Sequence, residues 1–305
     1  MSQLNELLQV IFDTIAPIFI IIGAAMLVAR IKPLNAQTLS RASIYLMSPA
    51  LILTNISRSG MGSDTLTIIL LASISLCVVM AFVGSFLARV LRFERKIASS
   101  FTLAAFIMNS VTFGLPFIDF ALGPVGLETA VVFSVGQVLI AYLFGTYVAS
   151  RGKSSPKTAI KNVLTIPMPY AFAIALWLNH TGFQLFPPLE KSISVLSQGL
   201  IPVTLILLGL QLGSVRFGGQ WKPIAMATFM RYGIGAAAAF GIAALFGLQG
   251  ISRQAFILEA SMPAGILSGV LSTEFGGDPE FASAVILVTT LTSALFLSGL
   301  LLILS

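Results

Sequence analysis

A few polar residues interrupt long apolar stretches of this sequence, and chemistry is expected there. Glu259 is the sharpest of them, because an acidic side chain deep in hydrocarbon costs about 2.5–3.5 kcal/mol on insertion scales and is usually functional. Loss of water favours the neutral form of a carboxyl group, which allows it to exchange a proton. We therefore predict a proton-exchanging role for Glu259. The alternative is a structural carboxylate, paired for example with Arg231 or lying near a surface.

A second polar group begins at Asn109. Its amide both donates and accepts hydrogen bonds, so it suits either a bound carboxylate or the capping of broken backbone. The hydroxyls of Ser110, Thr112 and Ser261 either face a cavity or bond back to their own helices. Arg231 is either a counter-charge or a side chain that extends to the membrane surface.

Four prolines lie inside apolar runs, at Pro49, Pro116, Pro202 and Pro263. Proline removes a helical hydrogen bond, and broken backbone in a membrane is tolerated only inside protein or beside a watery cavity. The helix N-termini that such breaks create carry partial positive charge. We therefore predict a binding site for an anionic substrate formed by Asn109, Ser110, Thr112, Gly114, Pro116, Ser261 and Pro263.

The elements that position these residues must lie in a membrane. The 305 residues are 57% hydrophobic and only 9% charged, whereas soluble domains carry about 25% charged residues. Ten apolar runs are each near the roughly 20 residues that a spanning helix needs. They cover residues 14–29, 39–56, 66–90, 98–117, 126–149, 163–179, 193–212, 223–246, 254–271 and 281–303.

Basic residues predict the orientation. Thirteen of the 17 fall after odd-numbered runs, at Arg30, Lys32, Arg41, Arg89, Arg92, Arg95, Lys96, Arg151, Lys153, Lys157, Lys161, Arg216 and Lys222. Arg58, Lys191 and Arg253 fall on the opposite side, and Arg231 lies inside the eighth run. By the positive-inside rule both termini are outside the cytoplasm. The positive net charge then reports topology and contact with lipid, not nucleic acid.

The prolines also suggest an internal repeat. Pro49 and Pro202 are separated by 153 residues, and Pro116 and Pro263 by 147. An odd number of helices in each half gives the halves opposite orientations, as in inverted-repeat transporters. We predict one five-helix repeat at residues 1–149, a basic cytoplasmic linker at 150–162 and a second repeat at 163–305.

Six short motifs in order along the chain carry a resemblance to a known family. They are Ala16-Pro17-Ile18-Phe19 with Gly23, the stretch Tyr45 to Ile52, Asn109 with Gly114-Leu115-Pro116, the stretch Ile201 to Gly213, Glu259 with Met262-Pro263-Ala264, and Thr289 to Ser293. With these motifs the chain resembles the auxin efflux carrier family, including its bacterial malonate-transporter-like members.

The resemblance implies an all-α membrane protein of two inverted five-helix repeats. Helices 1, 2, 6 and 7 would form a scaffold, and helices 3–5 and 8–10 a moving core of elevator type. Broken helices 4 and 9 would cross at their prolines and hold an organic anion, commonly a carboxylate. The long loop of the plant carriers is replaced by about a dozen residues here, which argues against auxin itself as the substrate.

Other classes remain as alternatives. A sodium-coupled organic-anion symporter of the bile-acid type is the closest, with Glu259, Ser261 and Thr112 as oxygen donors. An intramembrane enzyme would depend on His180 or on Gly276-Gly277-Asp278, and no zinc motif occurs in the sequence. The expected partners are a small organic anion and membrane lipid, with a homodimer left open. We expect no cofactor, a proton or sodium as coupling ion, and a bacterial inner membrane as location.

Overall fold

The computed structural model describes residues 9, 11–32, 34–145, 156–213, 221–274 and 276–304. Within these ranges the chain is helical, and the only β-type pairing is a single bridge between Met108 and Ala264. The first half contains the π-helical turn η1 (Ile11–Ile15), α2 (Ala16–Ile31), α3 (Ala36–Ala42), the π-helical turn η2 (Ser43–Met47), α4 (Ser48–Ser57), α5 (Ser63–Val90), α6 (Arg95–Phe106), the π-helical turn η3 (Ser110–Gly114), α7 (Leu115–Ile140) and the π-helical turn η4 (Ala141–Gly145).

The second half begins, after a gap in the described residues, with α9 (Pro156–Leu164). It continues with α10 (Met168–Thr181), α11 (Pro187–Gln198), α12 (Leu200–Gly213), α13 (Trp221–Phe229), the π-helical turn η5 (Met230–Ile234), α14 (Gly235–Leu245), α15 (Gly250–Ala260), α16 (Ile266–Glu274) and α17 (Pro279–Leu304). The predicted boundary between repeats near residue 150 lies outside the described residues. The later part of the predicted linker forms the start of α9, with Pro156 as its first residue.

Six continuous helical stretches are long and apolar enough to cross a membrane. They are Ile11–Ile31, Ser63–Val90, Ser110–Gly145, Pro187–Gly213, Trp221–Leu245 and Pro279–Leu304. The other predicted spans correspond to shorter segments: α3 to α4, α6, α9 with α10, and α15 with α16. The stretch Ser110–Gly145, 36 residues long, would be about 54 Å as one straight helix, nearly twice the thickness of the hydrocarbon core.

Gly123 divides that stretch. Its φ of 65° and ψ of −164° are not helical, a conformation open to glycine because it has no Cβ, and Pro124 follows it. The last part of the predicted fourth span therefore lies before this kink, and all described residues of the predicted fifth span lie after it.

The prolines interrupt helices less often than the sequence suggests. Of the four prolines Pro49, Pro116, Pro202 and Pro263, only Pro263 lies in an interruption, between the end of α15 and the start of α16. Pro49 and Pro116 lie at the starts of α4 and α7, directly after the π-helical turns η2 and η3. The wider turn changes which carbonyl faces the proline ring, so the helix continues. Pro202 lies in the first turn of α12, three residues after the junction at Gly199.

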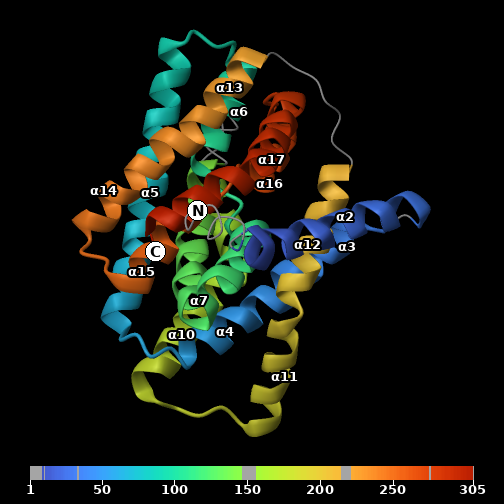
Figure 1. Cartoon of the computed structure of the whole chain (residues 1–305). Coiled ribbons are helices and arrows are strands. Elements are labelled where there is room, and N and C mark those ends of the chain that lie inside the picture. The colour runs from blue at the N-terminus through green and yellow to red at the C-terminus, as the bar shows by residue number, and fades with distance from the viewer. Residues whose placement is uncertain are drawn as a thin grey trace.

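The most extensive contacts divide the helices into two groups, and α7 of the second group also packs on α4 and α10 of the first. Figure 1 shows the arrangement of these helices. In the first group α2 packs on α12, and α4 packs on α10 and α11. In the second group α5 packs on α6 and α7, α15 on α7, and α16 on α17. Gly209 allows the close approach of α12 to α2, because a Cβ there would lie 2.6 Å from the carbonyl oxygen of Ile22. Small residues at helix–helix contacts allow such close approach.

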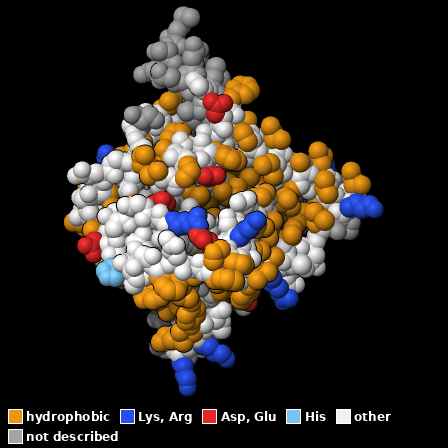
Figure 2. Space-filling model, turned by 90° about the horizontal axis from the view of Figure 1, so that it is seen from below, with side chains coloured by type: hydrophobic (Ala, Val, Ile, Leu, Met, Phe, Trp, Pro, Cys, Tyr) orange, Lys and Arg blue, Asp and Glu red, His pale blue; other side chains and the backbone are white. Residues whose placement is uncertain are grey.

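Apolar side chains form large patches on the face of the molecule seen in Figure 2, and charged side chains lie between these patches. Phe82 and Phe86 of α5 and Leu295 of α17 are exposed. An exposed apolar surface of this extent is unusual for a soluble monomer. It is suited to contact with lipid.

Candidate functional site

The two interrupted helices meet backbone to backbone. The residues between α6 and η3 face those between α15 and α16, with Met108 opposite Ala264 in an antiparallel bridge. The N–H of Asn109 donates to the carbonyl oxygen of Pro263 at 2.8 Å, and the N–H of Gly265 donates to that of Ile107 at 2.7 Å. The backbone groups that the breaks expose therefore satisfy one another, as burial requires.

The first break lies at a different place from the predicted one. The sequence placed it at Gly114 to Pro116, whereas the helix ends at Phe106 and resumes at Ser110. Ile107 is extended, with φ −97° and ψ 100°. The reason is that the π-helical turn η3 accommodates Pro116, so no break is needed at the proline.

Four helix ends meet at this crossing. The C-terminal ends belong to α6 and α15, and the N-terminal ends belong to η3, which continues into α7, and to α16. Each C-terminus carries about half a negative charge and each N-terminus about half a positive charge. The crossing therefore has an electrically positive side and a negative side.

A cavity of about 240 Å³ lies on the positive side. Residues at both N-terminal ends line it: Ser110, Val111 and Thr112 of η3 with the preceding Asn109, and Ile266 and Leu267 of α16 with the preceding Gly265. Its other polar lining residues are Ser40, Ser43, Ser48, Gln137, Tyr142, Thr204 and Gln211. None of the described lining residues is Asp, Glu, Lys or Arg, so the donors offered to a ligand are neutral.

Asn109 presents an unused donor in this lining. Only 4% of Asn109 is exposed, and its amide nitrogen has no hydrogen-bond partner among the described atoms. Its amide oxygen accepts from the hydroxyl of Thr112, and the side chain does not cap the helix that follows. Of the two predicted roles for this amide, capping is not adopted in the structure. The neighbouring hydroxyl of Ser110 is also buried and has no partner in the part of the chain that the structure describes.

Gln137 of α7 is a cavity residue that the sequence reasoning missed. Its amide nitrogen donates to the carbonyl oxygen of Met108 at 2.8 Å, while its buried amide oxygen has no partner among the described atoms. It thus ties α7 to the first break. The signal available in the sequence was an amide inside an apolar span, where such a group is costly unless it is paired.

Four predicted site residues lie outside the cavity lining: Gly114, Pro116, Ser261 and Pro263. Pro263 contributes the carbonyl that holds Asn109. Ser261 is fully buried, and its hydroxyl has no hydrogen-bond partner within the described ranges. Gly114 faces Glu259 instead, because a Cβ on Gly114 would lie 2.6 Å from Oε1 of that side chain.

Glu259 lies in the last turn of α15 and is fully buried. Neither carboxylate oxygen has a hydrogen-bond partner among the described atoms. No ion pair joins Glu259 to Arg231 in the described part of the chain. A buried carboxylate without partners is expensive, and a proton or a cation at these oxygens would remove that cost.

Arg231 does not extend to the membrane surface. It is fully buried, and its guanidinium donates to the carbonyl oxygens of Ala105, at 2.5 Å, and of Ala260. These carbonyls lie at the C-terminal ends of α6 and α15. Arg231 therefore lies on the negative side of the crossing.

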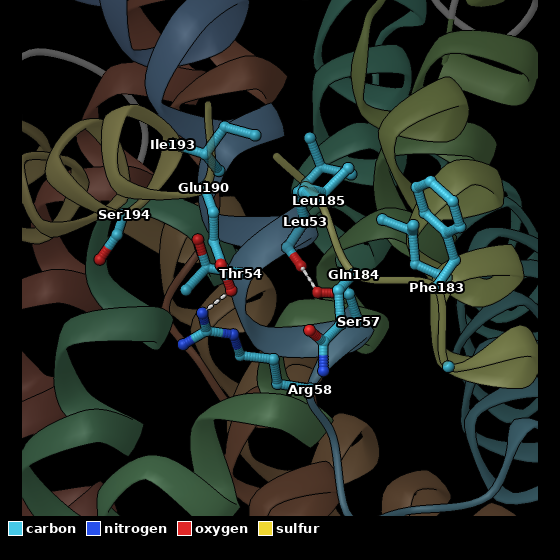
Figure 3. A pocket seen from close by; sticks show the side chains of 12 residues that line it. Leu53, Thr54, Ser57, Arg58, Phe183, Gln184, Leu185, Glu190, Ile193 and Ser194 are labelled. Atoms are coloured by element: carbon cyan, nitrogen blue, oxygen red, sulfur yellow. Dashed lines mark hydrogen bonds and ion pairs between the residues drawn. The ribbon is translucent and has the colours of Figure 1, made fainter. Parts of the chain in front are cut away.

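A second pocket, of about 380 Å³, shares no lining residue with the crossing cavity. Figure 3 shows it from close by. The end of α4, the loop after α10 and the start of α11 form it, and Arg58 pairs with Glu190 at its edge. None of the predicted site residues lines it. Although it is larger than the crossing cavity, its charged pair is partly exposed, and such pairs contribute little energy.

Asp278, considered above for an intramembrane enzyme, has a structural role. Its carboxylate accepts a hydrogen bond from the N–H of Phe281 at 3.0 Å, in the first turn of α17. Its own N–H donates to the hydroxyl of Ser100. Among the described residues, no group of three or more His, Cys, Asp or Glu side chains could hold a metal ion.

Comparison with known proteins adds three similarities. The model of the family described as "Membrane transport protein" matches residues 155–301. A protein of Methanocaldococcus jannaschii described as an uncharacterized transporter is 27% identical over 277 residues, which cover 88% of this chain and 89% of that protein. A protein of Methanothermobacter thermautotrophicus with the same description is 26% identical over 267 residues, which cover 85% and 86%.

Proposed function

We propose that this chain, which is a membrane transporter and not an enzyme, carries small organic anions, with carboxylates as the expected class. The observation that carries the proposal is the convergence of two helix N-termini on one cavity. Two partial positive charges favour an anion without any Lys or Arg in the lining. The amide nitrogen of Asn109, which has no partner among the described atoms, then donates to a carboxylate oxygen.

The cavity supports an inward-facing state. Three lining residues are close in sequence to basic residues: Ser40 is next to Arg41, and Ile166 and Gln211 are each five residues from a basic residue, Lys161 and Arg216. All three lining residues thus lie beside loops that the positive-inside rule assigns to the cytoplasm. A neighbouring cavity of about 420 Å³ shares Gln211 and two α16 residues and extends to Glu280. We take this as the cytoplasmic route to the site.

The two packing groups support an elevator-type movement. The first group corresponds to predicted spans 1, 2, 6 and 7, and the second to spans 3–5 and 8–10. Both breaks belong to the second group, while Ser43 and Thr204 of the cavity lining come from the first. Movement of the second group past the first would carry the crossing, and the anion on it, toward the other side of the membrane. The inverted ten-helix repeat is part of this proposal.

Glu259 is the proposed coupling residue. Its carboxylate is fully buried and has no hydrogen-bond partner among the residues that the structure describes, so it is suited to bind and release a proton during transport. A sodium-coupled symporter of the bile-acid type is the second candidate, because the same two oxygens could serve a hard cation, which prefers oxygen ligands. Flux into proteoliposomes driven by a pH gradient, without sodium, would favour the proton; flux that requires a sodium gradient would favour the second candidate.

The substrate class is tested by ligand-dependent stability of the purified protein. We expect acetate, malonate or succinate to raise the thermal midpoint of the wild type, because a ligand at 100 times its Kd stabilises the folded state by about 2.7 kcal/mol. Asn109→Ala should abolish this rise. Asn179→Ala is the matched control, because the Asn179 amide bonds to the carbonyl of Ser59, outside the cavity. A rise that persists in Asn109→Ala would refute the assigned site, and no rise in the wild type would refute the carboxylate class.

A further inference from the structure

The negative side of the crossing holds a buried cation that no ion pair accounts for. Arg231 is fully buried, and the ion pair found among the described residues joins Arg58 to Glu190 instead. An isolated charge away from water is strongly unfavourable unless nearby groups compensate for it. The groups that accept hydrogen bonds from Arg231 provide this compensation.

The guanidinium bridges the C-terminal ends of two different helices. One terminal nitrogen donates to the carbonyl of Ala105 in α6, and the other donates to that of Ala260 in α15. Each helix C-terminus carries about half a negative charge. Two such ends sum to about one negative charge, which balances one guanidinium. The planar fork of Arg also fits two acceptors at once, which a compact ammonium does with less directional control.

Two local features of the helical segment that carries Arg231 place its side chain in the interior. Arg231 lies in the π-helical turn η5, between α13 and α14, and such turns inside a helix are frequent at functional sites. One turn later Gly235 leaves room for it, since a Cβ there would lie 2.9 Å from a terminal nitrogen of the guanidinium. A larger side chain at position 235 would displace the fork.

The next residue supports the second break by another route. The hydroxyl of Tyr232 donates to the carbonyl of Thr289 in α17, and the hydroxyl of Thr289 accepts from the N–H of Ala264 at 3.1 Å. Two consecutive residues of η5 therefore support the crossing. Arg231 contacts the helix ends directly, and Tyr232 acts through Thr289 of α17.

We propose that Arg231 is the positioning residue of the crossing. It neutralises the two C-terminal ends and holds them together, so that the two N-terminal ends face the cavity in one fixed geometry. That this geometry serves anion binding rests on the function proposed above. The geometry itself is independent of that function, because it can be measured without any substrate.

The geometric test uses a disulfide across the bridge. Opposed residues of an antiparallel pair have Cα atoms about 4.5–5.5 Å apart, within the range that a disulfide spans. Met108→Cys and Ala264→Cys are introduced together with Cys77→Ser, which removes the single native cysteine. The rate of oxidative cross-linking is then compared among Arg231, Arg231→Lys and Arg231→Gln. Arg253→Gln is the matched control, because Arg253 lies over the ring of Phe240 in α14, not at the crossing.

We expect Arg231→Gln to slow cross-linking at least tenfold, Arg231→Lys to stay within about threefold of Arg231, and Arg253→Gln to leave the rate unchanged. Equal rates for Arg231 and Arg231→Gln would overturn the proposal, as would a Lys variant as slow as the Gln variant. If Arg231→Gln does not fold, Arg231→Lys decides: a folded Lys variant slowed tenfold overturns the charge argument. In a thermal shift with malonate, Arg231→Gln should require at least tenfold more malonate. Failure of malonate to bind the wild type would refute the substrate class and leave the cross-linking result standing.

Discussion

Adding one methyl group at Gly114 tests the contact between η3 and Glu259. The backbone of Gly114 is helical, with φ −66°, so Ala would be favoured there by helix propensity, by up to about 1 kcal/mol. Its Cβ, however, would lie 2.6 Å from Oε1 and 2.7 Å from Cδ of Glu259. Such overlap must displace the carboxylate or the backbone, and overpacking of this kind costs about 1–3 kcal/mol. We therefore expect Gly114→Ala to destabilise the protein despite the better propensity.

A double-mutant cycle isolates the contact. Glu259→Ala removes the obstructing carboxylate, so Gly114→Ala in that background should be neutral or stabilising, which gives an interaction energy of about 1–3 kcal/mol. The assay is thermal unfolding in detergent, followed by tryptophan fluorescence. Gly23→Ala in α2 is the control, because no atom lies within 4 Å of its added Cβ. Equal costs for Gly114→Ala with and without Glu259 would refute the placement of this carboxylate.

Four further results are expected. Gln137→Leu leaves the Met108 carbonyl unpaired and should cost about 1–3 kcal/mol in the same unfolding assay; an unchanged midpoint would contradict the contact. Gly209→Leu should separate α2 from α12 and lower the midpoint more than Gly114→Ala does, because its Cβ meets backbone. Glu259→Gln should retain malonate binding in the thermal shift but lose flux driven by a pH gradient; flux that still follows pH would exclude Glu259 as the coupling group. Arg58→Ala, which breaks a partly exposed ion pair, should change stability by less than about 1 kcal/mol, and a larger loss would show that the outer pocket is structural.

The membrane class, the transporter class and the family resemblance could be read from local information. Apolar content reports the solvent of the fold because hydrocarbon cannot hydrate charges. The motif that ends in Met262-Pro263-Ala264 predicted an interruption at the second break, and one lies there. The similarity to proteins described as membrane transport proteins and transporters supports the transporter class.

Proline alone did not locate the other break. The sequence favoured Pro116, yet the helix opens at Ile107 to Asn109, where no proline stands. The second break supplies backbone partners for an extended segment at that point, so its buried polar groups are satisfied. A π-helical turn accommodates Pro116 nearby. The pairing of the two breaks depends on segments far apart in the chain, and the π-helical turn depends on a change in hydrogen-bond register. Neither feature leaves a recognisable pattern in the local sequence.

The sequence by itself determined that the protein lies in a membrane, which residues are too polar for it, and that Asn109 and Glu259 belong to interrupted segments. Only the tertiary structure decided which of those polar residues line the cavity and which contact other parts of the crossing. It directs Asn109 to a neutral cavity with Gln137, sets Glu259 against Gly114, and buries Arg231 between two helix ends. The physical reason is that the charges at this crossing are largely those of helix ends. Their sum depends on which ends meet, and that is a property of packing and not of residue type.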